Sequence, residues 1–157
     1  MSSTSGLEQR FWSKVDKSGE CWLWTAATDR KGYGRIWVDG QRRQAHRVAY
    51  VLSGGEIPEG MLLDHRCHHT ACVRPEHLRL ATNKQNQENR SGAQCNSHSG
   101  ARGVYWNRQC QRWHARVKHH GRQIHVGLFD SLAEAEAAVA AKRRELFTHS
   151  DMDEVSA

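Results

Sequence analysis

Three potential metal ligands at regular spacing constrain the fold of this chain more than any other feature. Four residues separate Cys67 from Cys72, and four more separate Cys72 from His77. Thiolates and imidazoles are preferred zinc ligands, and zinc usually takes four ligands in a tetrahedron. Cys21, next to Trp22, is the obvious fourth candidate, because it would tie the N-terminal segment to this loop. The alternative is that these residues are ordinary buried thiols and a surface imidazole.

The size of the chain explains why such a metal staple is expected. With 157 residues the chain can form one ordinary domain or two very small ones, and a small hydrophobic core alone gives little stability. The five cysteines are an odd number, and residues 1–10 lack the apolar core of a secretory signal. Both observations favour metal binding over a disulfide framework and predict a cytoplasmic protein.

The charge of the chain points to a polyanionic partner. The net charge is +6 and the isoelectric point is about 9.3. Charge alone does not separate a nucleic acid from a membrane surface. However, no apolar run approaches the roughly 20 residues that span a bilayer, so we expect no membrane partner.

The first part of the chain shows alternating strand and helix signals. Asp39 and Gly40 form a two-residue turn signal between two strand-like segments, which predicts a tight hairpin. Gly54 and Gly55 would end the short helix that follows. The expected elements are strands 33–38 and 42–45, helix 46–52, strands 61–63 and 78–80, and a polar helix from residue 82 or 83 to 90.

Two further polar residues suit the chemistry of phosphodiester hydrolysis. His65 follows an apolar run just before the cysteine loop, and Asn86 lies one turn inside the polar helix. A neutral imidazole can act as a base for water, and an amide oxygen is a hard ligand for magnesium. The alternative is that His65 is another zinc ligand and Asn86 a surface amide.

These residues together resemble the ββα-metal core of HNH endonucleases, especially the His-Cys box homing type. The resemblance rests on Asp64-His65-x-Cys67, Cys72, Pro75, His77-Leu78 and Asn86, with the upstream strings Cys21-Trp22-x-Trp24, Gly32-Tyr33-Gly34 and Ala45-His46-Arg47 matching the lead-in of phage HNH proteins. The resemblance covers about residues 21–90 and implies a phage or mobile-element protein.

The resemblance implies a role for each matching residue. His65 would be the general base and Asn86 would bind a divalent cation such as Mg²⁺. Asp64 matches a metal-binding acid of many HNH proteins that the His-Cys box type lacks, so we rank it second. The implied structural zinc ligands are Cys21, Cys67, Cys72 and His77. Independently of the resemblance, an arginine near the scissile phosphate would help, and the candidates are Arg42, Arg43 and Arg47; the alternative is a merely solvated basic face.

The C-terminal part has the pattern of a cationic sheet. A stretch rich in Ser, Gly, Asn and Gln predicts a linker, and three strands near 103–107, 112–119 and 123–129 precede an Ala-rich helix over 132–147. No acidic residue lies between Glu88 and Asp130. In the middle strand, basic residues alternate with apolar ones, which predicts one cationic and one apolar face.

This part resembles the APETALA2/ethylene-response DNA-binding domain. The resemblance rests on Ser99-Gly100-x-Arg102-Gly103-Val104-x-Trp106, Trp113-x-Ala115 and Gly127-x-Phe129 with the following helix, over about residues 99–147. The residues expected to contact DNA, from the resemblance and from the cationic face, are Arg102, Trp106, Arg108, Arg112, Arg116 and Lys118. For Trp106 and Trp113, packing against the helix is the competing interpretation.

The sequence therefore predicts an α+β protein in two small domains. The expected parts are a flexible N-terminus (1–10), a nuclease domain with zinc (11–90), a linker (91–98), a DNA-binding domain (99–149) and a flexible tail (150–157). The leading hypothesis is a metal-dependent endonuclease for duplex DNA. The alternatives are a catalytically silent, zinc-stapled DNA-binding protein, and an RNA-binding or structural phage component. Double-strand cutting would need a homodimer or two successive nicks.

Overall fold

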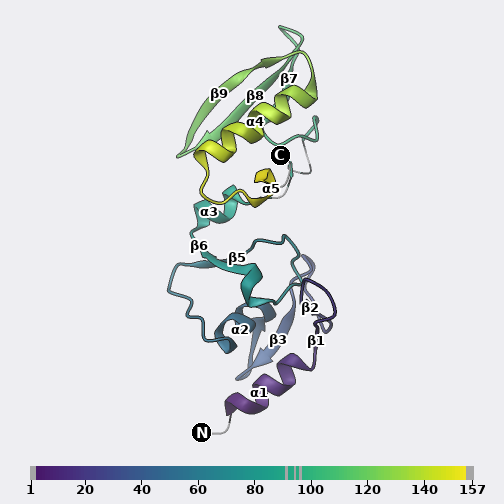
Figure 1. Ribbon diagram of the computed structural model, residues 1–157, viewed down its shortest axis with the longest axis vertical. Coiled ribbons are helices and arrows are strands. Elements are labelled where there is room, and N and C mark those ends of the chain that lie inside the picture. Colours follow the sequence, from purple (N-terminus) through teal and green to yellow (C-terminus); the bar gives the residue numbers. More distant parts are fainter. Residues whose placement is uncertain (1–2, 91, 94, 96, 155–157) are drawn as a thin grey trace. The chain divides into compact units, whose positions relative to one another are not determined.

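The computed structural model describes residues 3–90, 92–93, 95 and 97–154, and the chain divides into two compact units, Met1–Lys84 and Gln85–Ala157 (Figure 1). Both units mix helices with antiparallel strands, so the predicted α+β class is confirmed.

In unit 1 the elements are α1 (Ser3–Trp12), β1 (Val15–Asp16), β2 (Leu23–Trp24), β3 (Arg35–Val38), β4 (Gln41–Gln44), α2 (Ala45–Leu52), β5 (Leu62–His65), η1 (Pro75–His77) and β6 (Leu78–Ala81). Helix α3 (Asn83–Glu88) begins in unit 1 and continues into unit 2, which adds β7 (Val104–Asn107), β8 (Arg112–His119), β9 (Arg122–Phe129), α4 (Leu132–Leu146) and α5 (Asp151–Glu154).

The core of unit 1 is organised around the aromatic residues of α1 and β2. Phe11 is fully buried, and its ring centroid lies 5.1 Å from that of Trp24. Leu7 packs on the same cluster one turn earlier. The expectation of a flexible segment over residues 1–10 is therefore corrected from residue 3 onward, and residues 1–2 lie outside the described part. The helix forms because its apolar side chains are buried by distant segments, which composition does not reveal.

Two hairpins of unit 1 follow the sequence signals. Asp39 and Gly40 have φ angles of 49° and 71°, which suits a two-residue turn with two left-handed residues, and Val38 pairs with Gln41 across it. In the second hairpin β5 pairs antiparallel with β6 in the register His65↔Leu78. Strand β5 thus includes Asp64 and His65 rather than ending before them, so the backbone ladder fixes the position of both side chains.

Unit 2 is a three-stranded antiparallel sheet, in the order β7-β8-β9, with α4 lying across one face (Figure 1). Ala115 and Val117 of β8 point to this face and are buried with Ala135 and Val139 of α4. Close packing also requires Gly103, whose φ is +83° and where a Cβ atom would lie 2.5 Å from the carbonyl oxygen of Arg116. The expected three strands and Ala-rich helix are confirmed.

The C-terminal end of unit 2 corrects the expectation of a flexible tail over 150–157. Helix α5 follows α4, and the side chain of Asp153 accepts two hydrogen bonds from the Arg143 guanidinium at 2.8 and 2.6 Å. Both side chains are largely buried, at 9% and 12% exposure. A bidentate, shielded ion pair of this kind orders the segment. Residues 155–157 lie outside the described part.

The boundary between the units falls inside α3 rather than in the expected linker. The predicted nuclease domain ended at Arg90, whereas the compact units meet between Lys84 and Gln85. Residues 91, 94 and 96 of the predicted linker 91–98 lie outside the described part. Among the described helices, none is long and apolar enough to cross a membrane.

Candidate metal centre and nuclease site

The four predicted zinc ligands come from two distant segments that are joined by backbone hydrogen bonds. The amide of Trp24 donates to the carbonyl oxygen of Ala71 at 2.9 Å, and the amide of Val73 donates to that of Trp22 at 2.8 Å. The Arg74 guanidinium adds a bond of 2.7 Å to the carbonyl oxygen of Glu20. These contacts place the turn before β2 beside the loop between β5 and η1.

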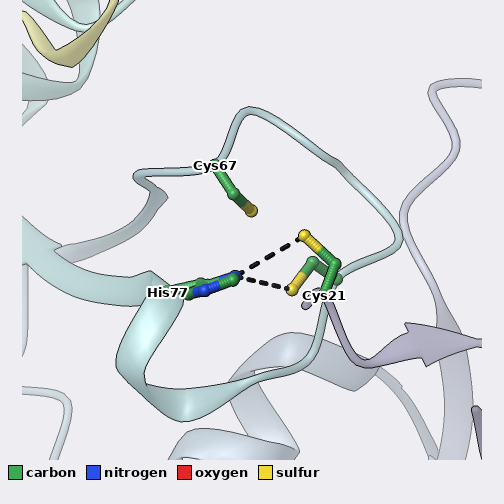
Figure 2. Close-up of side chains that lie close together, drawn as sticks. Cys21, Cys67 and His77 are labelled. Atoms are coloured by element: carbon green, nitrogen blue, oxygen red, sulfur yellow. Dashed lines mark hydrogen bonds between the residues drawn. The ribbon is translucent and has the colours of Figure 1, made fainter. Parts of the chain in front are cut away.

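All four predicted ligands converge. The potential ligand atoms of Cys21, Cys67, Cys72 and His77 lie within 4.8 Å of one another. Figure 2 shows the side chains of Cys21, Cys67 and His77 pointing toward a common centre from different parts of the chain. Cys72 is buried and the other three are partly buried. The other two cysteines, Cys95 and Cys110, are exposed and outside this cluster.

The distances within the cluster match the edges of a zinc tetrahedron. The Sγ atoms of Cys21 and Cys72 lie 3.5 and 3.6 Å from Nδ1 of His77. Zinc–sulfur and zinc–nitrogen bonds of about 2.3 and 2.05 Å at a tetrahedral angle give a sulfur–nitrogen edge of about 3.6 Å. The donor set and its spacing therefore fit a structural Cys₃His zinc site. His69, whose Nδ1 lies 3.5 Å from Sγ of Cys21, does not belong to the group of four.

The pKa values of two thiols in the cluster, Cys67 and Cys72, are shifted in opposite directions. Hydrogen bonding from Cys72, followed by bonding from other neighbours, lowers the pKa of the Cys67 thiol to about 4. The same interaction, together with burial, raises the pKa of Cys72. Zinc binds the thiolate form of cysteine, so a lowered pKa suits Cys67 as a zinc ligand.

His65 sits at the end of β5 with its ring held by the cysteine loop. The side chain is 6% exposed, and its Nε2 atom lies 3.0 Å from the carbonyl oxygen of Cys72. A carbonyl oxygen only accepts hydrogen bonds, so Nε2 carries the proton, and the neutral ring has Nδ1 as its basic nitrogen. Burial lowers the pKa of His65, which keeps the ring neutral. His65 is not among the four converging ligands, which disfavours its interpretation as another zinc ligand.

Two further aromatic side chains pack around His65, and sequence reasoning gave neither of them a role. The ring of His46, on α2, has its centroid 4.8 Å from that of His65, and the Tyr33 ring centroid lies 5.8 Å from it. His46 is 4% exposed. Its burial first, and then the nearby His65, Arg47 and Arg35, lower the pKa of His46 to about 3. The strings Gly32-Tyr33-Gly34 and Ala45-His46-Arg47 were the available signal.

Asp64, the second-ranked candidate for binding the catalytic cation, is buried and paired with an arginine. It is 7% exposed, and its Oδ2 atom accepts hydrogen bonds of 3.2 and 3.1 Å from Nε and Nη2 of Arg79, its cross-strand partner in the hairpin. The pair neutralises a charge that would otherwise be costly to bury.

Asn86 lies on α3 in unit 2, whereas His65 lies in unit 1. Its side chain is half-buried and makes no hydrogen bond to another described residue. The amide oxygen is thus available to a cation. Cooperation between Asn86 and His65 stays a prediction.

The arginines of unit 1 that were predicted to meet the scissile phosphate differ in exposure. Arg42 and Arg43 are exposed on β4, and Arg47 is half-buried on α2 directly after His46. Arg47 is adjacent to His46 in the chain, and its charge contributes to the lowered pKa of His46. All three remain predictions as phosphate contacts.

The face of the unit 2 sheet opposite α4 is polar and basic. Arg116 and Lys118 are exposed on β8, and the Arg116 guanidinium lies 4.4 Å from the centre of the Tyr105 ring. The Tyr105 hydroxyl is hydrogen-bonded to Nδ1 of His114, whose Nε2 is in turn hydrogen-bonded to His125. This chain of polar side chains lies in the middle of the predicted DNA-binding face.

Other residues that were predicted to contact DNA have partners in the protein. Arg112 forms two hydrogen bonds with Asp130, at 2.7 and 2.8 Å. Trp106 is 45% exposed but packs edge-on against Trp113, its cross-strand partner, which itself packs on the core beneath α4. The guanidinium of Arg102 binds backbone carbonyl oxygens at the end of α3. Arg108 is exposed in the turn after β7.

Comparisons with known proteins show which parts of the chain resemble proteins already described. A family model of HNH endonucleases matches residues 43–88, which include His65, Asn86 and three of the four clustered ligands. The chain is 39% identical over 69 residues to Protein 7.7 of Escherichia phage T7, which covers 44% of this chain and 53% of that protein. It is 40% identical over 75 residues to Protein 2.8 of the same phage, covering 46% and 50%.

A third relative is matched over nearly its whole length. The chain is 30% identical over 117 residues to Protein 3.8 of Escherichia phage T7, covering 74% of this chain and 93% of that protein. The chain spans about half the length of the first two relatives. No solved structure matches it. The chain therefore belongs to the family of Protein 3.8 of phage T7, and it carries an HNH endonuclease domain at residues 43–88.

Proposed function

We propose that the protein is a metal-dependent endonuclease that hydrolyses phosphodiester bonds of duplex DNA. The observation that carries the proposal is the state of His65. Its Nε2 proton is held by the carbonyl oxygen of Cys72, its pKa is lowered by burial, and it lies inside the HNH match. An imidazole in this state has a fixed tautomer and a fixed orientation, which a general base requires.

In this proposal the protein contributes a base, a rigid support and polar ligands. Nδ1 of His65 takes a proton from the water that attacks phosphorus in line with the leaving 3′ oxygen. His46 and Tyr33 pack against the ring and keep it from turning. The products carry a 5′ phosphate and a 3′ hydroxyl.

Oxygen ligands for a divalent cation would come from Asn86, with Asp64 as the second-ranked candidate. An amide and a carboxylate oxygen are the hard ligands that Mg²⁺ prefers. When bound, such a cation stabilises the negative charge that develops on the phosphate and on the leaving oxygen. Asp64 is already paired with Arg79, which supports the lower rank. The Cys₃His zinc, by contrast, would be purely structural.

Among the three candidate arginines we favour Arg47 as the contact to the scissile phosphate. Arg47 directly follows His46 on α2, and its charge acts on the His46 ring, which packs on the base. A guanidinium near the reacting phosphate would stabilise its developing charge. Arg42 and Arg43, exposed on β4, are better placed for phosphates farther along the strand.

Unit 2 is proposed to bind the duplex through the basic face of its sheet, in the manner of the APETALA2/ethylene-response domain. The three-stranded sheet with one packed helix supports this reading, although the HNH match ends before it. The contacts would come from Arg108, Arg116 and Lys118.

The phage relatives support action in the cytoplasm of the host cell. Their names say nothing of gene mobility, so the proposal is an endonuclease rather than a homing enzyme.

Cleavage of supercoiled plasmid tests the proposal. The native protein, with its zinc content measured, should give nicked or linear plasmid only when Mg²⁺ is added. His65→Ala should lose this activity, whereas His98→Ala, at an exposed position, should keep it. A dependence of linear product on the square of the protein concentration would indicate a homodimer.

The alternative functions have distinct outcomes in the same experiment. Zinc-loaded protein that binds plasmid but leaves it intact with Mg²⁺, Mn²⁺ and Co²⁺ would contradict the proposal and favour a silent DNA-binding protein. Preferential competition by RNA over duplex DNA would favour the third hypothesis.

A further inference from the structure

Helix α3 carries Asn86, and its C-terminal end is bound by the guanidinium of Arg102. Nη1 of Arg102 donates to the carbonyl oxygens of Glu88 and Arg90, both at 2.9 Å, and Nη2 donates to that of Gln87 at 3.0 Å. The last carbonyl groups of a helix have no partners within it, and a positive charge there also interacts favourably with the helix dipole. Arg102 therefore serves as a cap for the end of α3.

Arg102 is itself held in place by the C-terminal segment. Its carbonyl oxygen accepts a hydrogen bond of 3.0 Å from Arg143, which in turn binds the Asp153 carboxylate. The ring of Phe147 lies against its guanidinium, with 5.7 Å between the Cζ atom and the ring centre. The capping group thus has little freedom to move.

A second set of contacts fastens the residues directly after Asn86. The carboxylate of Glu88 accepts bonds of 3.4 Å from the amide and the hydroxyl of Thr148. The amide of Asp151 donates to the side-chain oxygen of Asn89 at 3.3 Å. Glu88 and Asn89 are only 5% and 4% exposed. The end of α3 is therefore built into unit 2, together with α4 and α5.

We propose that Arg102 is a positioning residue for the nuclease reaction, which sets the place of Asn86 by holding the end of α3. The inference rests on the proposed function, in which Asn86 binds the catalytic cation. It changes the role that family resemblance gave to Arg102, because a guanidinium that binds three carbonyl oxygens is not available to DNA. It also means that the sheet that binds DNA and the helix that holds the cation ligand form parts of one unit.

The consequence is a direct dependence of cation binding on the C-terminal unit. Weakening the anchor should let the end of α3 fray and move the Asn86 amide away from its working position. Residues that orient metal ligands typically change metal affinity by about 10- to 100-fold when they are removed. We therefore expect the Mg²⁺ concentration for half-maximal cleavage to rise at least about 10-fold in Arg102→Gln.

The test compares Arg102→Gln with Arg102→Lys, Thr148→Val and Arg122→Gln. Lysine can still donate to carbonyl groups and should restore part of the effect. Thr148→Val removes only the hydroxyl bond to Glu88 and should weaken the anchor mildly, which keeps the test usable if Arg102→Gln does not fold. Arg122→Gln removes the same charge from an exposed position of the same unit and should behave as native.

Two measurements are made on each protein. Hydrogen exchange followed by mass spectrometry should show faster exchange over residues 85–90 in Arg102→Gln, with the exchange of β7–β9 unchanged. Plasmid cleavage at increasing Mg²⁺ should show the shifted midpoint, with a maximal rate that returns toward native at saturation. A merely structural role would lower the activity without moving this midpoint.

The outcomes separate this inference from the proposed function. Exchange over residues 85–90 and a Mg²⁺ midpoint that match those of Arg122→Gln would overturn the role of Arg102. A native protein that cuts no DNA at any Mg²⁺ concentration would overturn the proposed function and, with it, the catalytic role of Arg102. In that case the hydrogen exchange would still decide whether Arg102 holds α3.

Discussion

Replacing Cys21 with Ser should remove zinc from the nuclease domain and unfold it at much lower temperature. Cys21 is the predicted ligand from the N-terminal segment, and its Sγ atom lies within 4.8 Å of the potential ligand atoms of the other three residues. Serine keeps the size of the side chain but supplies a poor zinc ligand, so the tetrahedron loses one corner. The substitution should therefore affect only metal binding and the metal-mediated link between the N-terminal segment and the cysteine loop.

The magnitude follows from mass action and the size of unit 1, Met1–Lys84. A ligand present at about 1,000 times its Kd stabilises the folded state by about 4 kcal/mol, and this contribution vanishes when the Kd rises above the free concentration. For a domain of 60–100 residues each kcal/mol corresponds to about 4–8 °C, so Tm should fall by roughly 15–30 °C. Affinity higher than this would make the loss larger.

The assay combines zinc stoichiometry by native mass spectrometry with calorimetric melting in buffered zinc. Cys110→Ser is the matched control, because Cys110 is exposed and outside the cluster. It should retain one zinc and the native melting temperature. A Cys21→Ser protein with one bound zinc and an unchanged melting transition would refute the reasoning and would remove Cys21 from the ligand set.

Three other predictions test the surroundings of the site. Burial keeps the folded-state pKa of His46 at about 3, below its usual 6.5, so the unfolded chain takes up the proton first. Stability should therefore fall by about 2 kcal/mol between pH 7 and pH 5, and denaturant unfolding of His46→Gln should show a shallower loss over that range. Arg79→Met leaves Asp64 buried without this partner and should cost about 3 kcal/mol in the same assay, so an unchanged unfolding midpoint would argue against the pair. Arg116→Ala should weaken DNA binding and reduce the salt dependence of log K by about one charge, whereas an unchanged slope in a salt titration would remove Arg116 from the interface.

Local patterns predicted most of the secondary structure. The Asp39-Gly40 turn, and the basic–apolar alternation of β8, depend on neighbouring residues alone, and the structure contains both features. The convergence of Cys67, Cys72 and His77 was also predictable, because their spacing confines them to one loop. The position of Cys21 was harder to predict, because its segment reaches the cluster through backbone hydrogen bonds to residues about 50 positions away.

The features that sequence reasoning missed depend on contacts between distant segments. His46 packs on His65 from a different element, and no periodicity relates the two positions. Arg102 matched a DNA-binding pattern, yet its guanidinium reaches the end of α3, 12 to 15 residues earlier. Polar composition suggested flexible ends, whereas Leu7 packs partly buried on the core of unit 1 and Asp153 forms a buried ion pair with Arg143. In each of these cases the side chain contacts a residue far away in the sequence instead of solvent. Neighbouring residues in the sequence do not show which of the two it will contact.

The most direct test of the central claim is the single-turnover rate of plasmid cleavage by His65→Ala relative to the native protein. Both proteins must carry one zinc and bind the plasmid equally, so that the ratio reports the chemical step. The account predicts a loss of about 10²- to 10⁴-fold at saturating Mg²⁺, as expected for removal of a general base. A rate within a factor of about three of the native value would show that His65 is not the base and would contradict the proposed mechanism.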